Sequence, residues 1–262
     1  MQGYWVIRTY NAGGVAEKTK FFVPGERPPK RISKRVKSDI RKQELNEASA
    51  IKNFARLINA NFTEGDLFVS ATFSPEGYAK LVAGMPVMDA DAEREEIYNR
   101  ANHQMKLLFD RVRYSAAKED IELKYLGVTS DYDAKHDKAV RVHLHMILPA
   151  AVRDIVKKKW TLGNVHIVEL KAQDDYLPLA EYMLRQVRHV PDRKKYTPSR
   201  NLIRPEPKDR IALNDSELRI PKGAKLIYRA EHRAGAPQYL RYFYPEQRFK
   251  NHKKAPEPKK RN

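Results

Sequence analysis

Two histidines in one apolar run could hold a divalent metal ion. His143 and His145 stand two residues apart within residues 140–148, whose other alternate positions are apolar. Because side chains alternate between the two faces of a β-strand, the apolar residues point one way and both imidazoles point the other. The sequence therefore predicts a metal pair that faces a site rather than the core. The pair alone is a weak motif, because alternating strands with two histidines also occur by chance.

A tyrosine further along the chain could act with this metal. A helix is predicted at residues 175–188, where Tyr182 lies opposite an apolar stripe that is made by Ala180, Met183, Leu184 and Val187. A tyrosine hydroxyl, with a pKa of about 10, needs nearby cations and a polarised phosphate to attack. Arg185 and a metal on His143 and His145 would supply both, so Tyr182 could attack a phosphodiester in line and form a phosphotyrosine.

The elements that must position these residues follow from hydrophobic periodicity and turn signals. The expected order is α+β rather than a regular alternation of strands and helices. Strands are predicted at residues 4–10, 19–23, 66–73, 121–129, 140–148 and 164–170, and helices at 39–59, after Ser74, at 91–117, 151–158 and 175–188. A further hairpin is predicted from residues 225–231 and 238–244.

Three segments in order resemble the motifs of the rolling-circle replication initiators of small phages and plasmids, members of the HUH endonuclease superfamily. Residues 67–73 (LFVSATF) resemble the first motif, residues 142–148 (VHLHMIL) the His-hydrophobic-His motif, and residues 179–185 (LAEYMLR) the catalytic tyrosine motif. The resemblance covers roughly residues 60–190, and residues 199–202 (SRNL) also look familiar. Two departures are Arg185, where many members have lysine, and the single tyrosine in its motif.

The resemblance implies a central antiparallel sheet of about five strands with helices on one face. It also implies a bound Mg or Mn ion and a covalent intermediate in which Tyr182 is joined to the 5'-phosphate of the cut DNA. The free 3'-hydroxyl of the cut strand would then prime synthesis. The partners would be single-stranded or origin DNA and the host helicase and polymerase. A second subunit, water, or another tyrosine such as Tyr176 or Tyr196 would then end the reaction cycle.

A third metal ligand is expected, because two imidazoles leave a hard divalent ion short of oxygen donors. In the family, an acidic or polar side chain on the neighbouring strand often serves. Asp131, just after the strand predicted at residues 121–129, is the first choice, and Glu122 is the second. His166 could also face the site, although a lone histidine on a strand is more often structural.

The charge of the chain points to nucleic acid as its partner. Lys and Arg outnumber Asp and Glu by 51 to 33, which gives a formal net charge of +18, and such a field attracts phosphate backbones. Candidate DNA-binding residues are Lys34, Arg35, Lys37 and Arg41 of a basic segment, and Arg241, which lies among aromatic residues able to stack bases. An ordinary strand of a terminal hairpin explains these aromatic residues equally well.

The expected organisation is one main domain with additions. Residues 1–190 would form the endonuclease domain, 191–247 an accessory segment with a hairpin, and 248–262 a disordered basic tail. The absence of cysteine excludes thiol chemistry and disulfides. Without a signal peptide or a long apolar run, a cytoplasmic protein of a bacterial host is expected. The alternatives are a relaxase or transposase of the same superfamily, or a non-enzymatic basic protein that binds DNA or RNA.

Overall fold

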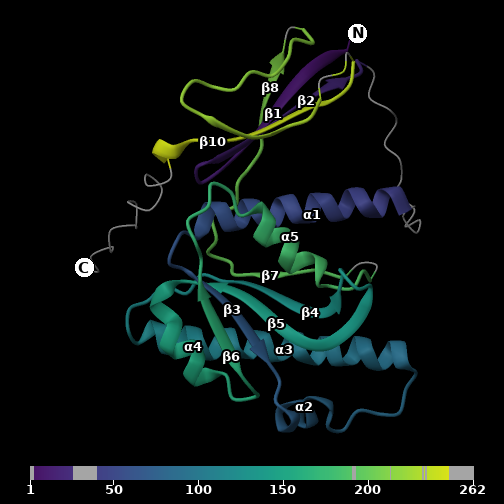
Figure 1. Ribbon diagram of the computed structural model, residues 1–262, viewed down its shortest axis with the longest axis vertical. Helices are drawn as coiled ribbons and strands as arrows, with labels where there is room; N and C mark the ends of the chain where they lie inside the picture. The colour runs from purple at the N-terminus through teal and green to yellow at the C-terminus, as the bar shows by residue number, and fades with distance from the viewer. Residues whose placement is uncertain are drawn as a thin grey trace. The chain divides into compact units, whose positions relative to one another are not determined.

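The computed structural model describes residues 3–25, 40–190, 193–212, 214–231, 233 and 235–247, without the side chains of residues 40–44 and 247. The chain divides into two compact units, one formed by Met1–Ser49 together with Ile203–Asn262 and the other by Ala50–Leu202. Each unit contains a five-stranded sheet (Figure 1), and every strand pair in both sheets is antiparallel. The predicted α+β fold with a central antiparallel sheet is therefore confirmed.

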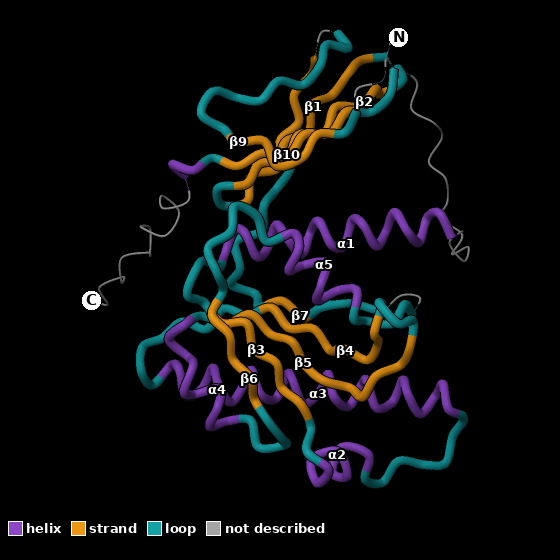
Figure 2. The backbone as a smooth tube through the Cα atoms, viewed as in Figure 1, coloured by secondary structure: helices purple, strands orange, loops and turns teal. Residues whose placement is uncertain are grey.

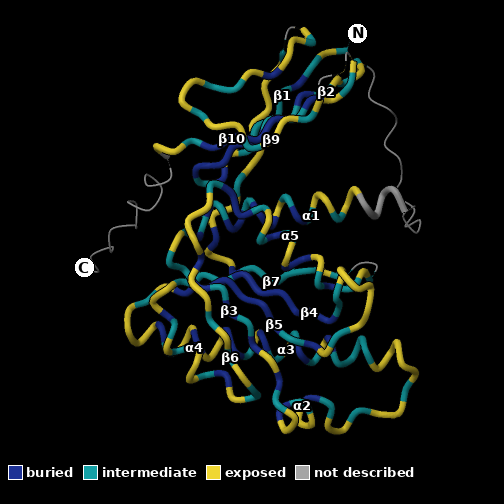
Figure 3. The backbone as a smooth tube through the Cα atoms, viewed as in Figure 1, coloured by how far each residue is buried: buried dark blue, intermediate teal, exposed yellow. Residues whose placement is uncertain are grey.

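The sheet of the unit Ala50–Leu202, here called the histidine sheet, has the strand order β6-β3-β5-β4-β7 (Figure 2). Its strands are β3 (Leu67–Thr72), β4 (Leu126–Asp133), β5 (Lys138–Leu148), β6 (Val165–Glu169) and β7 (Thr197–Pro198). Strand β4 begins later than the sequence predicted, because residues 121–125 carry no strand pairing. The central strands β3 and β5 contain much of the buried core (Figure 3).

One face of the histidine sheet packs on three helices. Val142, Leu144 and Met146 of β5 share a core cluster with the apolar stripe of the longest helix, α3 (Ala90–Ala117). The helices α2 (Pro75–Val82) and α4 (Arg153–Lys159) add Leu81 and Val156 to the same cluster. A short 3-10 turn, η1 (Ala150–Val152), precedes α4.

The approach of α3 to this sheet depends on a glycine. A Cβ atom at Gly127 of β4 would lie 2.7 Å from the sulfur of Met105 and 2.8 Å from the ring of Phe109. Since such distances are too short for real Cβ contacts, only glycine allows β4 to lie this close to α3.

The opposite face of the sheet is also covered by helices, which corrects the expectation of helices on one face. Phe54 and Ile58 of α1 (Ile40–Asn61) and Met183 of α5 (Leu177–Arg185) cluster with Val128 and Ile147 of the sheet. The expectation failed because Val128 and Ile147 are apolar on the face that also carries the histidines. An apolar surface on this face needs its own helical cover.

The second sheet, here called the terminal sheet, joins the two ends of the chain in the order β8-β1-β2-β10-β9. Its strands are β1 (Tyr4–Ala12), β2 (Val15–Val23), β8 (Lys208–Ala212), β9 (Lys225–Arg229) and β10 (Gln238–Phe243). Strands β1 and β2 form the predicted hairpin, which turns at Gly13 with a φ of 60°. Strands β9 and β10 form the second hairpin that the sequence predicted. A 3-10 turn, η2 (Pro245–Gln247), follows.

The hairpin of β1 and β2 belongs with the C-terminal strands, and this differs from the expected domain of residues 1–190. Strand β8 pairs with β1, and β10 pairs with β2. A lone hairpin leaves both of its edges unpaired, and strands from residues 203–247 satisfy these edges here. The predicted basic tail, residues 248–262, lies outside the described residues.

Among the described residues, no helix has the length and apolar character needed to cross a membrane.

Candidate active site

Strand β5 presents both histidines on one face of the histidine sheet, as the alternation predicted. His143 pairs in register with Thr72 of β3 and Ser130 of β4, whereas His145 pairs with Ser70 and Val128. Residues that are paired across antiparallel strands share a face. The site is therefore a shallow row of polar side chains across the centre of the sheet, on the face that α5 covers.

Three polar side-chain atoms meet at this row. The Nε2 atoms of His143 and His145 are 3.1 Å apart. The side-chain oxygen Oε1 of Gln186, which follows the last turn of α5, lies 3.3 Å from the first and 3.2 Å from the second. The three atoms thus form a nearly equilateral triangle between the sheet and the end of α5.

The hydrogen bonds behind this triangle fix the tautomer of one imidazole and the orientation of the amide. The Nδ1 atom of His143 lies 3.1 Å from the carbonyl oxygen of Arg141, which can only accept, so the proton of a neutral ring is on Nδ1. The Nδ1 atom of His145 lies 3.0 Å from the hydroxyl of Ser70. The amide nitrogen of Gln186 donates to the carbonyl of Tyr182 at 3.2 Å, which turns its Oε1 toward the imidazoles.

This donor set fits a small divalent cation. Two ligands of one Mg²⁺ or Zn²⁺ ion, each 2.0–2.1 Å from it at near-octahedral or tetrahedral angles, lie about 3 Å apart. The 3.1–3.3 Å edges of the triangle match this separation, and they equally suit a hydrogen bond from the Nε2–H of a neutral His145 to Oε1 of Gln186. Mg and Mn, the ions expected from the sequence, prefer oxygen donors, which the amide of Gln186 supplies, whereas two imidazole nitrogens suit ions such as Zn.

Burial keeps one of these imidazoles neutral. His145 is 3% exposed, and this burial, with the neighbouring His143 adding to it, lowers the pKa of His145 from 6.5 to about 4. A neutral imidazole is the form that binds a metal, so the environment of His145 favours ligation over a wide pH range.

Helix α5 places Tyr182 beside the histidines. As predicted, Ala180, Met183 and Leu184 are fully buried, whereas Tyr182 is 52% exposed. The tyrosine ring lies 5.6 Å from the ring of His145 between centroids, and 6.1 Å from Phe68 of β3, edge-on. Tyr182 therefore stands at the edge of the triangle with one side open to a substrate.

The start of α5 is fixed to α1. The carboxylate of Asp175 accepts from the backbone N–H of Leu177 at 3.1 Å and from the amide of Asn59 at 2.8 Å. The other side of the Asn59 amide accepts from the N–H of Tyr176 at 2.9 Å. These contacts satisfy polar groups at the start of α5. They thereby fix the position of Tyr182 relative to the sheet.

Arg185 lies on the exposed side of α5. Its side chain is 61% exposed, and its guanidinium lies 3.7 Å from the carboxylate of Glu181 one turn earlier. An exposed pair of this kind is weak, so Arg185 is available to a phosphate at the same open side as Tyr182.

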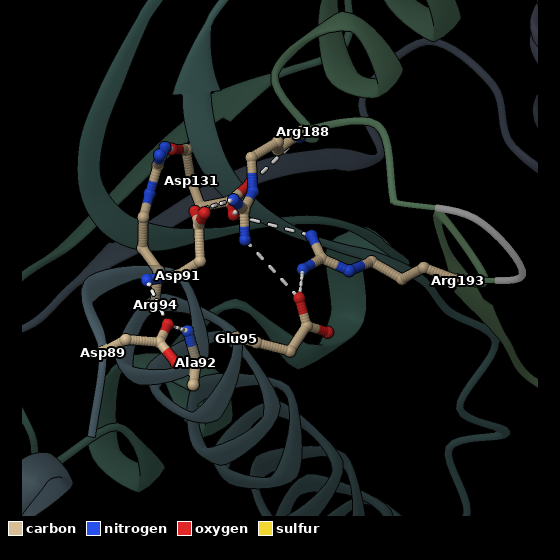
Figure 4. A network of polar contacts seen from close by, with 8 residues as sticks. All are labelled: Asp89, Asp91, Ala92, Arg94, Glu95, Asp131, Arg188 and Arg193. Carbon is tan, nitrogen blue, oxygen red and sulfur yellow. Dashed lines mark hydrogen bonds and ion pairs between the residues drawn. The ribbon is translucent and has the colours of Figure 1, made fainter. Parts of the chain in front are cut away.

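The structure does not bring Asp131 to the histidines, which corrects its assignment as a metal ligand. Its carboxylate accepts from the backbone N–H of Arg188 at 3.0 Å and forms ion pairs with Arg188 at 3.8 Å and Arg193 at 3.5 Å. Both arginines also pair with Glu95 of α3 (Figure 4). A β-bulge between Ser130 and Tyr132 turns Asp131 out of the row that faces His143.

Asp131 instead holds the end of α5. The backbone N–H groups of Asp131 and Tyr132 both donate to the carbonyl of Gln186 at 3.1 Å. Since the side chain of Gln186 carries one corner of the triangle, this clamp positions that corner. The carbonyl of Asp131 accepts from Arg94 of α3 at 3.2 Å, which connects the clamp to the network of Figure 4.

The other candidates from the sequence lie elsewhere. Glu122 precedes β4, is exposed, and accepts from the amide of Asn201 at 3.0 Å. His166 of β6 is exposed and pairs with Ser70, so it shares the face of His145 with one strand between them. Tyr176 is 4% exposed and Tyr196 packs against the ring of Phe54 at 4.8 Å.

The proposed DNA contacts have mixed outcomes. Lys34, Arg35 and Lys37 lie outside the described residues, as does the side chain of Arg41 in the first turn of α1. Arg241 is 1% exposed, and its guanidinium pairs with the buried carboxylate of Glu17 at 2.8 Å. As Arg241 stands in the structure, it is a buried ion-pair residue and not a surface contact for phosphate.

Sequence reasoning missed Gln186. It was missed because an acidic or histidine ligand was expected. Within the described part of the chain, no three His, Cys, Asp or Glu residues form a metal site. One signal was present: Gln186 follows Tyr182 by four residues, which places both on one face of a helix. The hydroxyl of Ser130, buried opposite His143 with no hydrogen-bond partner among the described residues, was also missed.

Comparisons of the chain with protein-family models, with curated proteins and with solved structures gave no significant match.

Proposed function

We propose that this protein is a metal-dependent enzyme that nicks and rejoins single-stranded DNA through Tyr182 and thereby initiates rolling-circle replication of a phage or plasmid. The observation that carries the proposal is the triangle of His143, His145 and Gln186 beside the open ring of Tyr182. Neither half of this arrangement would suggest phosphodiester chemistry alone. Together they supply a cation site and a nucleophile for one phosphate.

Each residue of the site has a role in the proposed reaction. The hydroxyl oxygen of Tyr182 attacks the scissile phosphorus, the new bond from oxygen to phosphorus forms, and the bond to the 3'-oxygen breaks. Tyr182 gives its hydroxyl proton to water as it attacks, the leaving 3'-oxygen takes a proton from water, and the phosphodiester energy is kept in the 5'-phosphotyrosine. Arg185 stabilises the phosphate charge from the exposed side of α5. A Mg or Mn ion, when bound, withdraws electron density from the phosphate oxygens.

The partners in this proposal are single-stranded origin DNA and the helicase and polymerase of a bacterial host, in whose cytoplasm the protein would act. A relaxase or a transposase would use the same atoms on a different DNA. The chemistry proposed here is common to all three roles, so it can be tested without the origin sequence.

The decisive experiment asks for a covalent adduct. The full chain is incubated with labelled single-stranded DNA from its own replicon and Mn²⁺, denatured, and analysed by gel and by mass spectrometry of the tyrosine peptide. We expect an adduct on Tyr182 that disappears in Tyr182→Phe and with a chelator, and that persists in the control Tyr4→Phe, an exposed tyrosine in β1. Binding of DNA without any adduct would refute the proposal and favour a non-enzymatic nucleic-acid-binding protein.

A further inference from the structure

The two faces of the terminal sheet differ in their charge. One face carries the side chains of Trp5, Ile7 and Thr9 of β1 and of the residues paired in register with them on the neighbouring strands. This face is here called the basic aromatic face. Its cations are Lys18, Lys20, Lys208, Arg210 and Arg229, and none of its strand positions is acidic. The five strands contain two carboxylates, Glu17 and Asp209, and both lie on the other face.

The carboxylates of the other face already have arginine partners. Asp209 binds the guanidinium of Arg8 through two hydrogen bonds of 2.8 and 2.7 Å, and Glu17 pairs with Arg241 at 2.8 Å. On that face, the charges of Arg8 and Arg241 are therefore neutralised within the sheet. The basic aromatic face has no carboxylate on its strands to do the same.

One half of the basic aromatic face has an internal cover. Leu218 and Ile220 of the segment before β9 pack on Ala16, Leu240 and Tyr242. In the same segment, the carbonyl of Ser216 accepts a hydrogen bond from the ammonium of Lys20 at 2.6 Å. Glu217 of this segment forms an ion pair with Arg229 at 2.5 Å. This half, over β2, β10 and β9, is therefore filled by the chain itself.

The other half, over β8, β1 and the side chains of Lys18 and Phe22 in β2, carries cations without a carboxylate. Lys208 and Arg210 are exposed, and neither forms an ion pair within the described part of the chain, nor does Lys18. Burial and the nearby positive charge of Arg210 lower the pKa of Lys18. Two like charges held together without a counterion are relieved by a bound anion.

Aromatic rings lie at the end of this row of cations. Trp5 and Phe22 are directly paired across β1 and β2, with their rings edge-on at 5.5 Å. Phe22 is 50% exposed, and the ammonium of Lys20 lies 5.6 Å from the Trp5 ring. The half-buried Trp5 ring and the exposed Phe22 ring thus adjoin the row of Lys18, Arg210 and Lys208, and proteins bind single strands with rings that stack the bases beside cations that meet the phosphates.

We infer that the open half of the basic aromatic face, formed by Trp5, Phe22, Lys18, Lys208 and Arg210, binds single-stranded DNA. Bases stack on Trp5 and Phe22, and phosphates lie along Lys18, Lys208 and Arg210. The face is a second nucleic-acid site on a separate compact unit, beyond the proposed nicking chemistry. The choice of DNA as the strand rests on the proposed function, whereas the stacking site rests on the geometry of the terminal sheet.

The test measures affinity without cleavage. The full chain carrying Tyr182→Phe is titrated, with a chelator present, into labelled oligothymidylate, and anisotropy reports binding. Trp5→Ala combined with Phe22→Ala is expected to weaken binding at least about thirtyfold, because two stacked bases are lost and each contributes roughly 1–3 kcal/mol. The matched control is Tyr4→Ala with Ile211→Ala, two exposed apolar residues of the other face, 44% and 66% exposed. An effect no larger than that of the control overturns the inference.

A second pair of variants tests the cations. Lys18→Gln with Arg210→Gln is expected to lower the slope of log affinity against log salt by about 1.4, at about 0.7 for each phosphate of a single strand. Lys222→Gln with Arg204→Gln, exposed cations of the same unit, removes the same charge away from the face. Equal slopes for the two pairs would contradict phosphate contacts at this face.

Intrinsic fluorescence covers the case in which the alanine variants fold poorly. The chain has two tryptophans, and Trp160 is only 5% exposed in the core of the other unit. Stacking should therefore quench Trp5, and Trp5→Phe should remove most of the quenching. Quenching that is unchanged in Trp5→Phe overturns the inference, as does equal loss of affinity for duplex DNA or tighter binding to RNA.

The two proposals can fail separately. If the face variants lose affinity but the protein with Tyr182 forms no adduct, the nicking proposal fails and this site stands. If the adduct forms and the face variants bind like their control, the nicking proposal stands and this site is refuted.

Discussion

The two five-stranded sheets of this protein make different use of the same architecture. The histidine sheet is covered by helices on both faces, and the candidate site lies where His143 and His145 of β5 meet Gln186 at the end of α5. The terminal sheet has an internal cover over only half of its basic aromatic face. Full cover holds the two imidazoles and the Gln186 amide within hydrogen-bonding distances, whereas partial cover leaves rings and cations open. In our proposals, the chemistry therefore belongs to one unit and the second DNA-binding face to the other.

The largest expected effect tests this separation from the histidine sheet. His145→Ala should slow adduct formation about a thousandfold, because a lost ligand removes several kcal/mol of charge stabilisation from the reaction. Affinity for single-stranded DNA should stay within about twofold. The matched control is His166→Ala, which removes an exposed imidazole from the same face. Adduct rates measured at saturating DNA decide the point, and equal rates for the two variants would show that His145 holds no ion.

Removing a buried carboxylate from each sheet sharpens the comparison. Asp131→Ala should destabilise the unit Ala50–Leu202 by about 3–5 kcal/mol, since it leaves Arg188 and Arg193 without a buried partner. Glu17→Ala should destabilise the terminal sheet by a similar mechanism through Arg241. Urea unfolding in a Trp5→Phe background isolates Trp160 as the probe of the unit Ala50–Leu202. The unfolding midpoint reported by Trp160 should fall in Asp131→Ala and stay unchanged in Glu17→Ala. A midpoint that falls only in Glu17→Ala would mean that the network of Figure 4 does not stabilise this unit.

Acidification should also act on the histidine sheet. His145 has a pKa of about 4 when folded and an ordinary value of 6.5 when unfolded, so between these values the unfolded chain binds the extra proton. Stability should therefore rise with pH from about 4 to 6.5, by about 3 kcal/mol for this group. Trp160 unfolding curves of the wild type and His145→Asn across this range measure the effect. A wild-type slope that His145→Asn retains in full would assign the pH dependence to other groups.

Much of the fold could be predicted from the sequence because local patterns decide it. Alternation in residues 140–148 placed both histidines on one face, and the apolar stripe of α5 placed Tyr182 on the exposed side. The hairpin of β1 and β2 followed from its glycine turn. The partners of that hairpin did not, because pairing between the two ends of the chain leaves no local signal.

The third corner of the candidate site was predicted wrongly for a physical reason. Asp131 is a better oxygen donor than an amide, and the predicted strand ended just before it. The observed β4 runs on to Asp133 with a bulge, which turns the Asp131 carboxylate toward Arg188 and Arg193. Chemical preference alone could not show that Gln186, from another element, reaches the imidazoles.

Binding of Mn²⁺ to the full chain by calorimetry tests the central claim most directly. Wild type should show one saturable site, Gln186→Ala should weaken it by about 10–100-fold, and Gln186→Glu should retain it, since a carboxylate replaces the amide oxygen. Asp131→Asn, which keeps the backbone clamp on Gln186, should bind within about threefold of wild type. The account would be contradicted if the wild type had no saturable site. It would also be contradicted if Asp131→Asn lost Mn²⁺ binding while Gln186→Ala kept it.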